Sequence, residues 1–237
     1  ACSINDTVLV SFFQMPAVAN AGVDMHFCGF SGDMTGNMPS VGVGTWTATG
    51  PGTIVFLPQN SNTATMTVDA YGAYNVKWSI RNGACFTTDS AIVTFDEMPQ
   101  PANAGANQAI CGLLANLTGS TPSAGTGAWT MISGAGNPIF GNANASNTTF
   151  ASLSYGTYIL RWTITNGACV STDDITIIFD QYPAPADAGP DDSICVNDYA
   201  FRAIPTNAGI GHWELVSGSG GNIANYTDAN SYVGAIP

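Results

Sequence analysis

Residues 72–95 read "GAYNVKWSIRNGACFTTDSAIVTF" and residues 156–179 read "GTYILRWTITNGACVSTDDITIIF". Apolar residues occupy every second position before the shared Asn-Gly pair, and the alternation returns after it. A period of two residues is typical of a strand with one buried face, and Asn-Gly is a strong signal for a tight turn. Each stretch therefore predicts a β-hairpin. The predicted inward residues are Tyr74, Val76, Trp78, Ile80, Ala91, Val93 and Phe95, then Tyr158, Leu160, Trp162, Ile164, Ile175, Ile177 and Phe179.

The two hairpins belong to a longer internal repeat. Cys2, Cys85 and Cys169 are separated by 83 and 84 residues, and Cys28, Cys111 and Cys195 have the same intervals. The spacing recurs in two further series, Trp46, Trp129, Trp213 and Pro16, Pro99, Pro183. A fixed period across many landmarks indicates tandem copies of one unit. The unit is long enough for a small domain and too long for a solenoid repeat.

The rest of each unit supplies further short strands. Apolar or alternating runs occur at residues 63–68, 113–119, 125–134 and 148–153, and Val8, Val10 and Phe12 repeat the last strand at the start of the chain. The 27 Gly and 13 Pro lie mostly between such runs, and no window has the apolar stripe of a helix. About seven short strands per unit predict an all-β chain of tandem immunoglobulin-like β-sandwich domains in a linear array.

Composition excludes two classes of partner. Only 8% of residues are charged, and 4 basic against 16 acidic residues give a net charge of −12. Such a polyanion repels phosphate groups, so we expect no nucleic-acid partner. No apolar stretch approaches the roughly 20 residues that span a bilayer, so we expect no membrane insertion in this segment.

Several motifs resemble a known family. "ANAGANQAICG" (residues 102–112) and "ITNGACVSTDDITIIF" (residues 164–179) resemble PKD-like domains. More narrowly, they resemble the cysteine-containing tandem repeats of giant cell-surface adhesins of Bacteroidota, including gliding-motility adhesins. The resemblance covers essentially the whole chain and implies a PKD-like sandwich at an extracellular, cell-surface location. It implies as partners the neighbouring repeats of the same chain, and other copies in a filament or a surface polysaccharide.

The repeat period also predicts the domain boundaries. Residues 1–16 correspond to the last strand of a preceding repeat, residues 17–99 and 100–183 to two repeats, and residues 184–237 to a partial repeat without its last strands. Pro99 and Pro101 keep the linker short and extended. We therefore expect the chain to be a window on a longer array. A donor-strand scheme, in which residues 1–16 complete a neighbour, is the alternative.

The cysteines predict disulfides, because they recur at two positions per unit in a charge-poor chain with an extracellular resemblance. The favoured pairing lies within each unit, Cys28–Cys85 and Cys111–Cys169, which resembles an immunoglobulin bridge. Pairing across the linker would instead give Cys2–Cys28, Cys85–Cys111 and Cys169–Cys195. A third option joins neighbouring domains, Cys28 to Cys169. It arises because Cys111 would end the first strand of its unit and Cys169 would begin the last. A standard sandwich places these two points near opposite ends of the domain.

No catalytic or metal motif is recognisable. His26 and His212 are not at equivalent repeat positions, and no P-loop, zinc-protease or nucleophile-elbow motif occurs, so we expect no enzyme activity. Two sets of polar residues do recur, Asp6, Asp89, Asp173 and Asp24, Asn107, Asp191. Calcium needs about six to eight oxygen ligands. We therefore interpret the first set as closing the hairpin through side chain-to-backbone hydrogen bonds, with calcium as the alternative and no cofactor expected.

Three tripeptides of Asp, then Ser or Thr, then an apolar residue resemble the O-glycosylation signal of Bacteroidota proteins. They predict candidate O-glycosylation at Thr7, Ser90 and Ser193. Thr7 and Ser90 occupy the same position of the repeat, 83 residues apart.

Two function classes fit these observations. The first is a set of structural stalk or filament repeats of a secreted bacterial surface adhesin, giving reach and mechanical strength for attachment or gliding. The second is a PKD-like accessory or carbohydrate-binding spacer of a secreted polysaccharide-degrading enzyme. A carbohydrate-binding region needs exposed aromatics in a flat platform, whereas the strand pattern places Trp78 and Trp162 on an apolar face. We expect Trp46, Trp78, Trp129 and Trp162 in domain cores, which favours the stalk.

Overall fold

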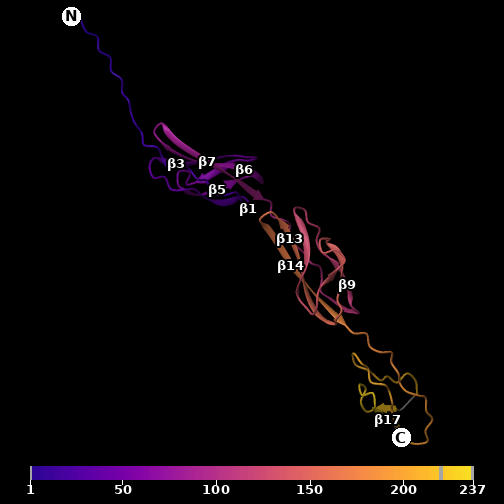
Figure 1. Ribbon diagram of the computed structural model, residues 1–237. Helices are drawn as coiled ribbons and strands as arrows, with labels where there is room; N and C mark the ends of the chain where they lie inside the picture. The colour runs from indigo at the N-terminus through magenta and orange to yellow at the C-terminus, as the bar shows by residue number, and fades with distance from the viewer. Residues whose placement is uncertain (1, 219–220, 236–237) are drawn as a thin grey trace.

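The computed structural model describes residues 2–218 and 221–235, and every regular element in this part of the chain is a β-strand. Figure 1 shows two β-sandwiches placed end to end along one line, followed by a smaller three-stranded sheet. We call them repeat 1 (residues 25–96), repeat 2 (residues 108–180) and repeat 3 (residues 198–235). The predicted all-β fold of tandem sandwiches in a linear array is confirmed.

Repeat 1 consists of two facing sheets. The larger sheet has the order β1-β7-β6-β3, with β1 at Met25–Cys28, β7 at Cys85–Asp96, β6 at Gly72–Asn82 and β3 at Val43–Thr49. The smaller sheet has the order β2-β5-β4, with β2 at Ser31–Thr35, β5 at Thr63–Val68 and β4 at Ile54–Leu57. These strands include the run predicted at residues 63–68.

Repeat 2 reproduces this arrangement strand for strand. Its larger sheet has the order β10-β13-β14-β8, with β10 at Thr126–Ser133, β13 at Gly156–Asn166, β14 at Cys169–Asp180 and β8 at Gln108–Cys111. Its smaller sheet has the order β11-β12-β9, with β11 at Ile139–Phe140, β12 at Asn147–Ala151 and β9 at Leu114–Thr118. Repetition of the fold therefore follows repetition of the sequence.

The strand order identifies the immunoglobulin-like class. In both repeats the second, fifth and fourth strands form one sheet and the third, sixth and seventh form the other, as in immunoglobulin domains. The first strand lies on the larger sheet and pairs in parallel with the last strand, so that Cys28 is opposite Asp96 and Cys111 is opposite Asp180. Each of these cysteines therefore lies at the end where the last strand finishes.

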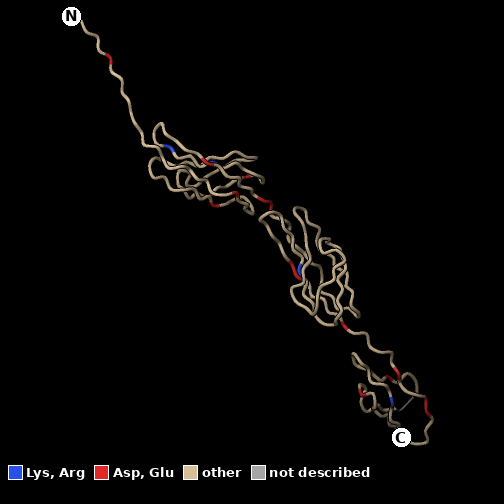
Figure 2. The backbone as a smooth tube through the Cα atoms, in the orientation of Figure 1, with Lys and Arg blue, Asp and Glu red and all other residues tan. Residues whose placement is uncertain are grey.

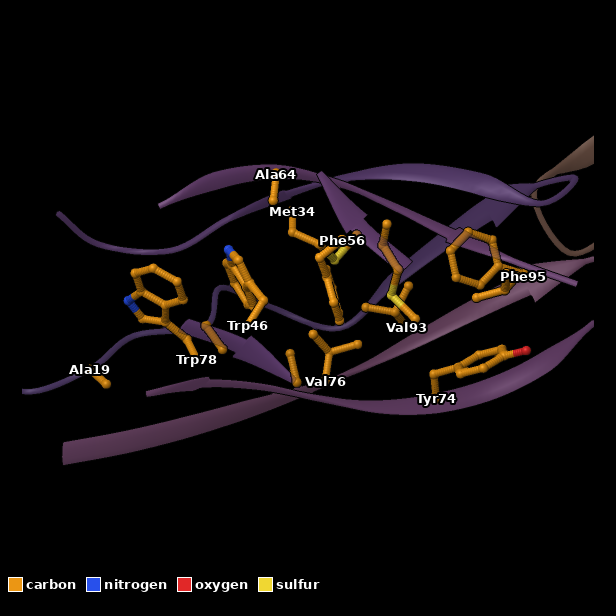
Figure 3. Close-up of a cluster of buried hydrophobic side chains, with 14 of the residues drawn as sticks. Ala19, Met34, Trp46, Phe56, Ala64, Tyr74, Val76, Trp78, Val93 and Phe95 are labelled. Atoms are coloured by element: carbon orange, nitrogen blue, oxygen red, sulfur yellow. The ribbon is translucent and has the colours of Figure 1, made fainter. Parts of the chain in front are cut away.

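Tryptophans fill the space between the sheets. In Figure 3, Trp78, Trp46, Phe56 and Phe95 lie in a row inside repeat 1. Trp46, Trp78 and Trp162 are fully buried and Trp129 is 2% exposed. The indole N–H groups of Trp46, Trp78, Trp129 and Trp162 donate to the backbone carbonyls of Ser61, Asn37, Ser146 and Ser120, respectively. The predicted burial of these four side chains is confirmed, and none of them presents a flat face to solvent.

A tyrosine at the start of the sixth strand anchors each sandwich corner. The Tyr74 hydroxyl donates to the Ala70 carbonyl over 2.7 Å, and the Tyr158 hydroxyl donates to the Ser154 carbonyl over the same distance. A tyrosine bonded to a backbone carbonyl a few residues upstream is a hallmark of immunoglobulin-like sandwiches. The sequence pattern predicts only that these residues lie on an apolar face, and the structure adds the hydrogen bond of the hydroxyl group.

One expected strand, at residues 8–12, did not form. Residues 8–12 lie in an extended, exposed segment with no strand, because within the described chain no sheet lies beside them to pair with. In repeat 3 the described strands are β15 at Asp198–Ala200, β16 at Gly221–Ile223 and β17 at Tyr232–Ala235. They match the smaller sheet alone, and Trp213 is only half-buried. The boundaries expected at residues 16, 99 and 183 stay predictions.

Candidate functional site: the junction between repeats

The hairpin turn of repeat 2 docks on the end of repeat 1. Gly167 and Ala168 form a two-residue turn between β13 and β14, and Gly167 has a positive φ of 56°. Glycine at the first turn position with positive φ matches a type II′ hairpin. The Asn166 side chain donates to the Glu97 carbonyl over 2.8 Å. The predicted hairpin is therefore present, and its tip forms the interface with the neighbouring repeat.

The Asp96 carboxylate lies at the centre of this interface. Its Oδ2 atom accepts the Ala168 backbone N–H over 2.8 Å and lies 3.0 Å from Nδ1 of His26. A Cβ atom on Gly167 would come within 2.0–2.4 Å of the same carboxylate group. Glycine is thus required here both for the turn and for the close approach of Asp96.

A disulfide closes the junction between Cys28 of repeat 1 and Cys169 of repeat 2. The Cα atoms are 4.9 Å apart, the two residues are 141 positions apart in sequence, and Cys169 is fully buried. The bridge adds a covalent link to the peptide linker, residues 97–107. Repeats 1 and 2 are therefore joined twice.

The favoured pairing within each unit, Cys28–Cys85 and Cys111–Cys169, is wrong. Cys85 begins β7, whereas Cys28 lies opposite Asp96, where β7 finishes. The two ends of β7, Cys85 and Asp96, are 11 positions apart, roughly 36 Å at the rise of a β-strand. Cys111 and Cys169 are kept apart along β14 in the same way. The remaining described cysteines, Cys2, Cys85, Cys111 and Cys195, are free.

Repeat 1 offers the same docking surface at its own hairpin. The Asn82 side chain donates to the Gln14 carbonyl over 2.9 Å, as Asn166 does to Glu97. The Cys85 thiol lies 3.6 Å from the Phe13 carbonyl, the counterpart of the 3.3 Å between Cys169 Sγ and the Asp96 carbonyl. The "NGAC" motif therefore positions the same contacts twice, once with a whole repeat and once with an extended segment.

The linker is held to repeat 2 by side chains of its last strand. The backbone N–H of Ala102 donates to Ser171 Oγ and that of Ala104 to Asp173 Oδ2, both over 2.8 Å. In the other direction, Asn107 accepts the Thr176 N–H over 2.8 Å. β8 pairs only with residues 177–180, at the end of β14. Along the earlier part of β14, these side chains hold the linker in place of backbone pairing. The linker consequently has little freedom to bend.

The equivalent bonds in repeat 1 show that this arrangement is part of the repeat. Thr87 and Asp89 accept the N–H groups of Ala19 and Ala21, and Asp24 accepts that of Ile92. The interpretation of these recurring residues as side chain-to-backbone partners is confirmed, but the expected partner is corrected. They hold the preceding segment along the last strand and do not close the hairpin.

The Asn-Ala-Gly motif explains how the linker turns into the sandwich. Asn103 accepts the Gly105 N–H over 2.8 Å, and Gly105 has a φ of +88° that favours glycine. Ala104 between them is fully buried in the core of repeat 2. The motif thus points one small apolar residue inward from an otherwise exposed segment.

We predict that Asp173→Ala destabilises repeat 2 by about 1–3 kcal/mol, because the partly buried N–H of Ala104 loses its acceptor. Chemical denaturation measured by tryptophan fluorescence gives the change. Asp173→Asn keeps an acceptor oxygen and should lose less. Asp174→Ala, on the exposed face of the same strand, is the matched control and should cost less than Asp173→Ala. Equal losses for the two alanine variants would contradict the assigned role.

The recurring carboxylates do not gather into a metal site. Asp89 and Asp173 are engaged with backbone N–H groups, and residues 2–218 and 221–235 contain no cluster of three or more His, Cys, Asp or Glu able to hold an ion. Calcium is the alternative interpretation from the sequence. That the repeats need no cofactor stays a proposal.

Charge is sparse along both sandwiches, as Figure 2 shows. One cross-strand pair is bidentate, Arg161 to Asp174 over 2.7 and 2.8 Å. The Arg161 hydrogen bond lowers the pKa of Asp174, so this pair favours the folded state at neutral pH. That contribution is lost as the pH falls through the lowered pKa. It is small, because both side chains are about two-fifths exposed.

The candidate O-glycosylation residues Thr7, Ser90 and Ser193 are all exposed. Thr7 lies on the extended N-terminal segment, Ser90 faces out from β7, and Ser193 follows the linker to repeat 3. A glycan can be attached only to an accessible side chain, and all three residues meet this requirement. The modification of these three residues stays a proposal.

Sequence reasoning missed three residues of the junction. Asp96, Asn166 and Gly167 carry the contacts between repeats, whereas the Asn-Gly pair by itself predicts only a turn. A usable signal existed. Asp96 and Asp180 both end the last strand and recur 84 residues apart, at the position that faces the next hairpin.

No protein-family model and no curated protein matches this sequence. Solved structures similar to it include the PKD domain of KIAA 1837 protein, at 22% identity over 39% of this chain and 92% of that one, with a TM-score of 0.31. The fibronectin(III)-like modules of Clostridium thermocellum CbhA are 15% identical over 70% of this chain and 95% of theirs, with a TM-score of 0.39. Sidekick-1 immunoglobulin domains 1–5 are 12% identical over 95% and 54%, with a TM-score of 0.41. These overlaps are too small to carry an argument, and the sandwich assignment rests on strand order.

Proposed function

We propose that the chain is a stretch of structural repeats in the stalk of a secreted bacterial surface adhesin. Its task would be to give reach and to transmit load without contributing chemistry. The observation that supports this best is the Cys28–Cys169 bridge, which joins two successive sandwiches in addition to the peptide linker. A domain pair that only needed to be tethered would not require a second covalent link.

The non-covalent contacts support the same function. Asn166 and Ala168 donate hydrogen bonds to the end of repeat 1, and Pro99 in the linker is buried. Ser171 and Asp173 hold the linker against β14. Because each of these contacts opposes bending at the junction, the two repeats should move as one rod.

Two further elements of the proposal rest on chemistry and resemblance. Disulfides persist in oxidising compartments, which favours an extracellular location. The Bacteroidota adhesin origin rests on the resemblance of the cysteine-containing motifs. Residues 2–218 and 221–235 contain no helix with the length and apolarity to cross a bilayer. Partners in this proposal are the neighbouring repeats and, on the cell surface, further copies or a polysaccharide.

The carbohydrate-binding alternative needs aromatic rings that can lie against a sugar. The four tryptophans of repeats 1 and 2 are at most 2% exposed, so they cannot supply that platform. The stalk is therefore the function we favour.

We predict that small-angle scattering of the full chain in solution gives a rod. A compact chain of this length would have a radius of gyration of about 18 Å, whereas three units of roughly 40 Å in line should give about 30 Å or more. A value near that of a compact particle would contradict the stalk. Binding to insoluble polysaccharide in a depletion assay would support the alternative instead.

A further inference from the structure

We propose that the outer face of the larger sheet of repeat 1 binds an anionic polysaccharide, one that carries carboxylate groups on its sugars. Lys77 and Arg81 would bind two of these carboxylates, and the hydroxyl side chains beside them would form hydrogen bonds with the sugar rings. This inference rests on the proposed function and deepens it, because it names the class of polysaccharide and the face of the stalk that contacts it.

Two of the four basic residues of the chain lie on this face. Lys77 and Arg81 are outward residues of β6, four positions apart, which is roughly 13 Å at the rise of a β-strand. Both residues are exposed, and neither forms an ion pair within residues 2–218 and 221–235. Two cations on one flat face are therefore available to an external anion.

The corresponding face of repeat 2 is neutral, although it has the same strands in the same order. Arg161 has the position of Lys77, and its guanidinium group donates to both carboxylate oxygens of Asp174 on the neighbouring strand. The residue opposite Lys77 on the equivalent strand is Ser90, which carries no charge. The fold can thus neutralise a cation at this position, and repeat 1 lacks the carboxylate that does so.

The side chains around Lys77 are short and hydroxylated. The two central rows across β3, β6 and β7 are Thr45, Ser79, Thr88 and Thr47, Lys77, Ser90. Hydroxyl groups both donate and accept hydrogen bonds, as the hydroxyl groups of a sugar do. The fully buried part of a protein–protein interface is mostly apolar, and these rows contain no large apolar side chain. They therefore favour a sugar over a protein as the partner.

Arg81 is held in place by an aromatic ring at the end of the face. Its guanidinium carbon lies 5.3 Å from the centroid of the Phe86 ring, and Phe86 is 55% exposed. This cation–π contact orients the guanidinium group and leaves its N–H groups able to bind a carboxylate through two parallel hydrogen bonds. Arg81 is thus oriented before any ligand binds.

A neighbouring repeat on the hairpin leaves this face accessible. In repeat 2, whose hairpin contacts repeat 1, Val170 has the position of Phe86 and is 54% exposed. The contacts of that junction come from the turn, where Asn166 and Ala168 donate hydrogen bonds to repeat 1. The junction therefore covers the tip of a hairpin and not the outer face of its sheet.

The charge of the chain selects among polyanions. Two carboxylates border the face, and both are engaged, Asp96 with His26 and Ala168 and Asp24 with the N–H of Ile92. More distant charges are screened beyond about 8 Å at physiological salt. Duplex DNA carries one charge per about 1.7 Å, more than two cations on a chain of net charge −12 can match. A polyuronate, with one carboxylate per sugar, is the better fit.

Soluble polygalacturonate is the probe that tests this inference. The full chain, produced in a host that does not glycosylate it, is titrated with the polymer by calorimetry. We expect binding that weakens as salt is added, and at least about tenfold weaker binding of the fully methyl-esterified polymer, whose carboxylates are masked. Equal binding of the esterified polymer, tighter binding of DNA, or no binding would overturn the inference. The stalk function, which scattering tests, would stand in each of these cases.

Substitutions on the two faces locate the site. Lys77→Gln combined with Arg81→Gln should weaken binding at least about tenfold, the usual effect of losing hydrogen bonds to charged groups. Ser90→Asp keeps every cation but places opposite Lys77 the carboxylate that repeat 2 has, so it should weaken binding as well. Arg161→Gln is the matched control in repeat 2 and should leave binding unchanged. Thermal unfolding followed by circular dichroism verifies that each variant is folded. Unchanged binding of the double variant, or an equal loss with Arg161→Gln, would overturn the assignment.

Discussion

Pulling this chain from its two ends under oxidising conditions should leave 141 residues unable to extend, because the Cys28–Cys169 bridge carries the load past them. Reduction should release those residues. At about 3.3–3.6 Å per extended residue, the fully stretched chain should lengthen by roughly 500 Å. Force spectroscopy with optical tweezers measures this change as the difference in contour length between oxidised and reduced molecules.

Matched variants separate the bridge from other effects of the reductant. Cys28→Ser should give the long contour even under oxidising conditions. Cys111→Ser changes a free cysteine of the same strand position, so it should behave like the unmodified chain. Bridges within each unit would instead hide 57 and 58 residues, and the released length would be shorter by roughly 90 Å. A released length shorter by that amount, or no change in contour length on reduction, would refute the Cys28–Cys169 bridge.

The sequence predicted the fold well because the fold depends on local patterns. Alternation around Trp78 and Trp162 identifies inward and outward positions on the sixth strand, and both rings are buried. The Asn-Gly pair predicts a turn at Gly83 and Gly167, and both glycines have positive φ. These signals depend on residues a few positions apart, which is why the sequence alone contains them.

The junction could not be predicted in the same way, because it depends on how distant strands pair. Whether Cys28 meets Cys85 or Cys169 is decided by the parallel pairing of β1 with β7, and no local pattern specifies that. The recurring Asp89 and Asp173 show the same limit. Their bonding to backbone was predictable from residue type, whereas the segment they bind is 68 or 69 residues away.

Residues 210–217 of repeat 3 show what tertiary context adds. Residues 210–217 correspond to β3 and β10, which pair with β6 and β13. Within the described residues of repeat 3 no such partner strand is present, and residues 210–217 form no strand. A strand pattern is therefore realised only where a neighbour completes the hydrogen bonds.

The core prediction with the largest stability effect concerns Trp162. Trp162→Ala should destabilise repeat 2 by about 3–5 kcal/mol, the usual cost of emptying a buried tryptophan site. The ring is fully buried, packs 5.1 Å from the Trp129 ring between centroids, and lies so close to Gly127 that a Cβ there would come within 2.2 Å. Gly127 has no side chain that could fill the space left by the indole ring. The surrounding atoms therefore cannot easily close the cavity that Trp162→Ala would create. Ser120 also loses the N–H that its carbonyl accepts.

Amide hydrogen exchange, read repeat by repeat, measures the effect and supplies an internal control. Protection should fall across β13 and β14, while repeat 1, with its own core around Trp78, should keep its protection. Trp162→Phe retains much of the packed ring and should lose less than Trp162→Ala. A ring that served sugar binding would behave in the opposite way, because its removal would abolish polysaccharide binding and leave exchange unchanged. Loss of protection confined to repeat 2 would therefore assign Trp162 to the core that keeps this repeat folded.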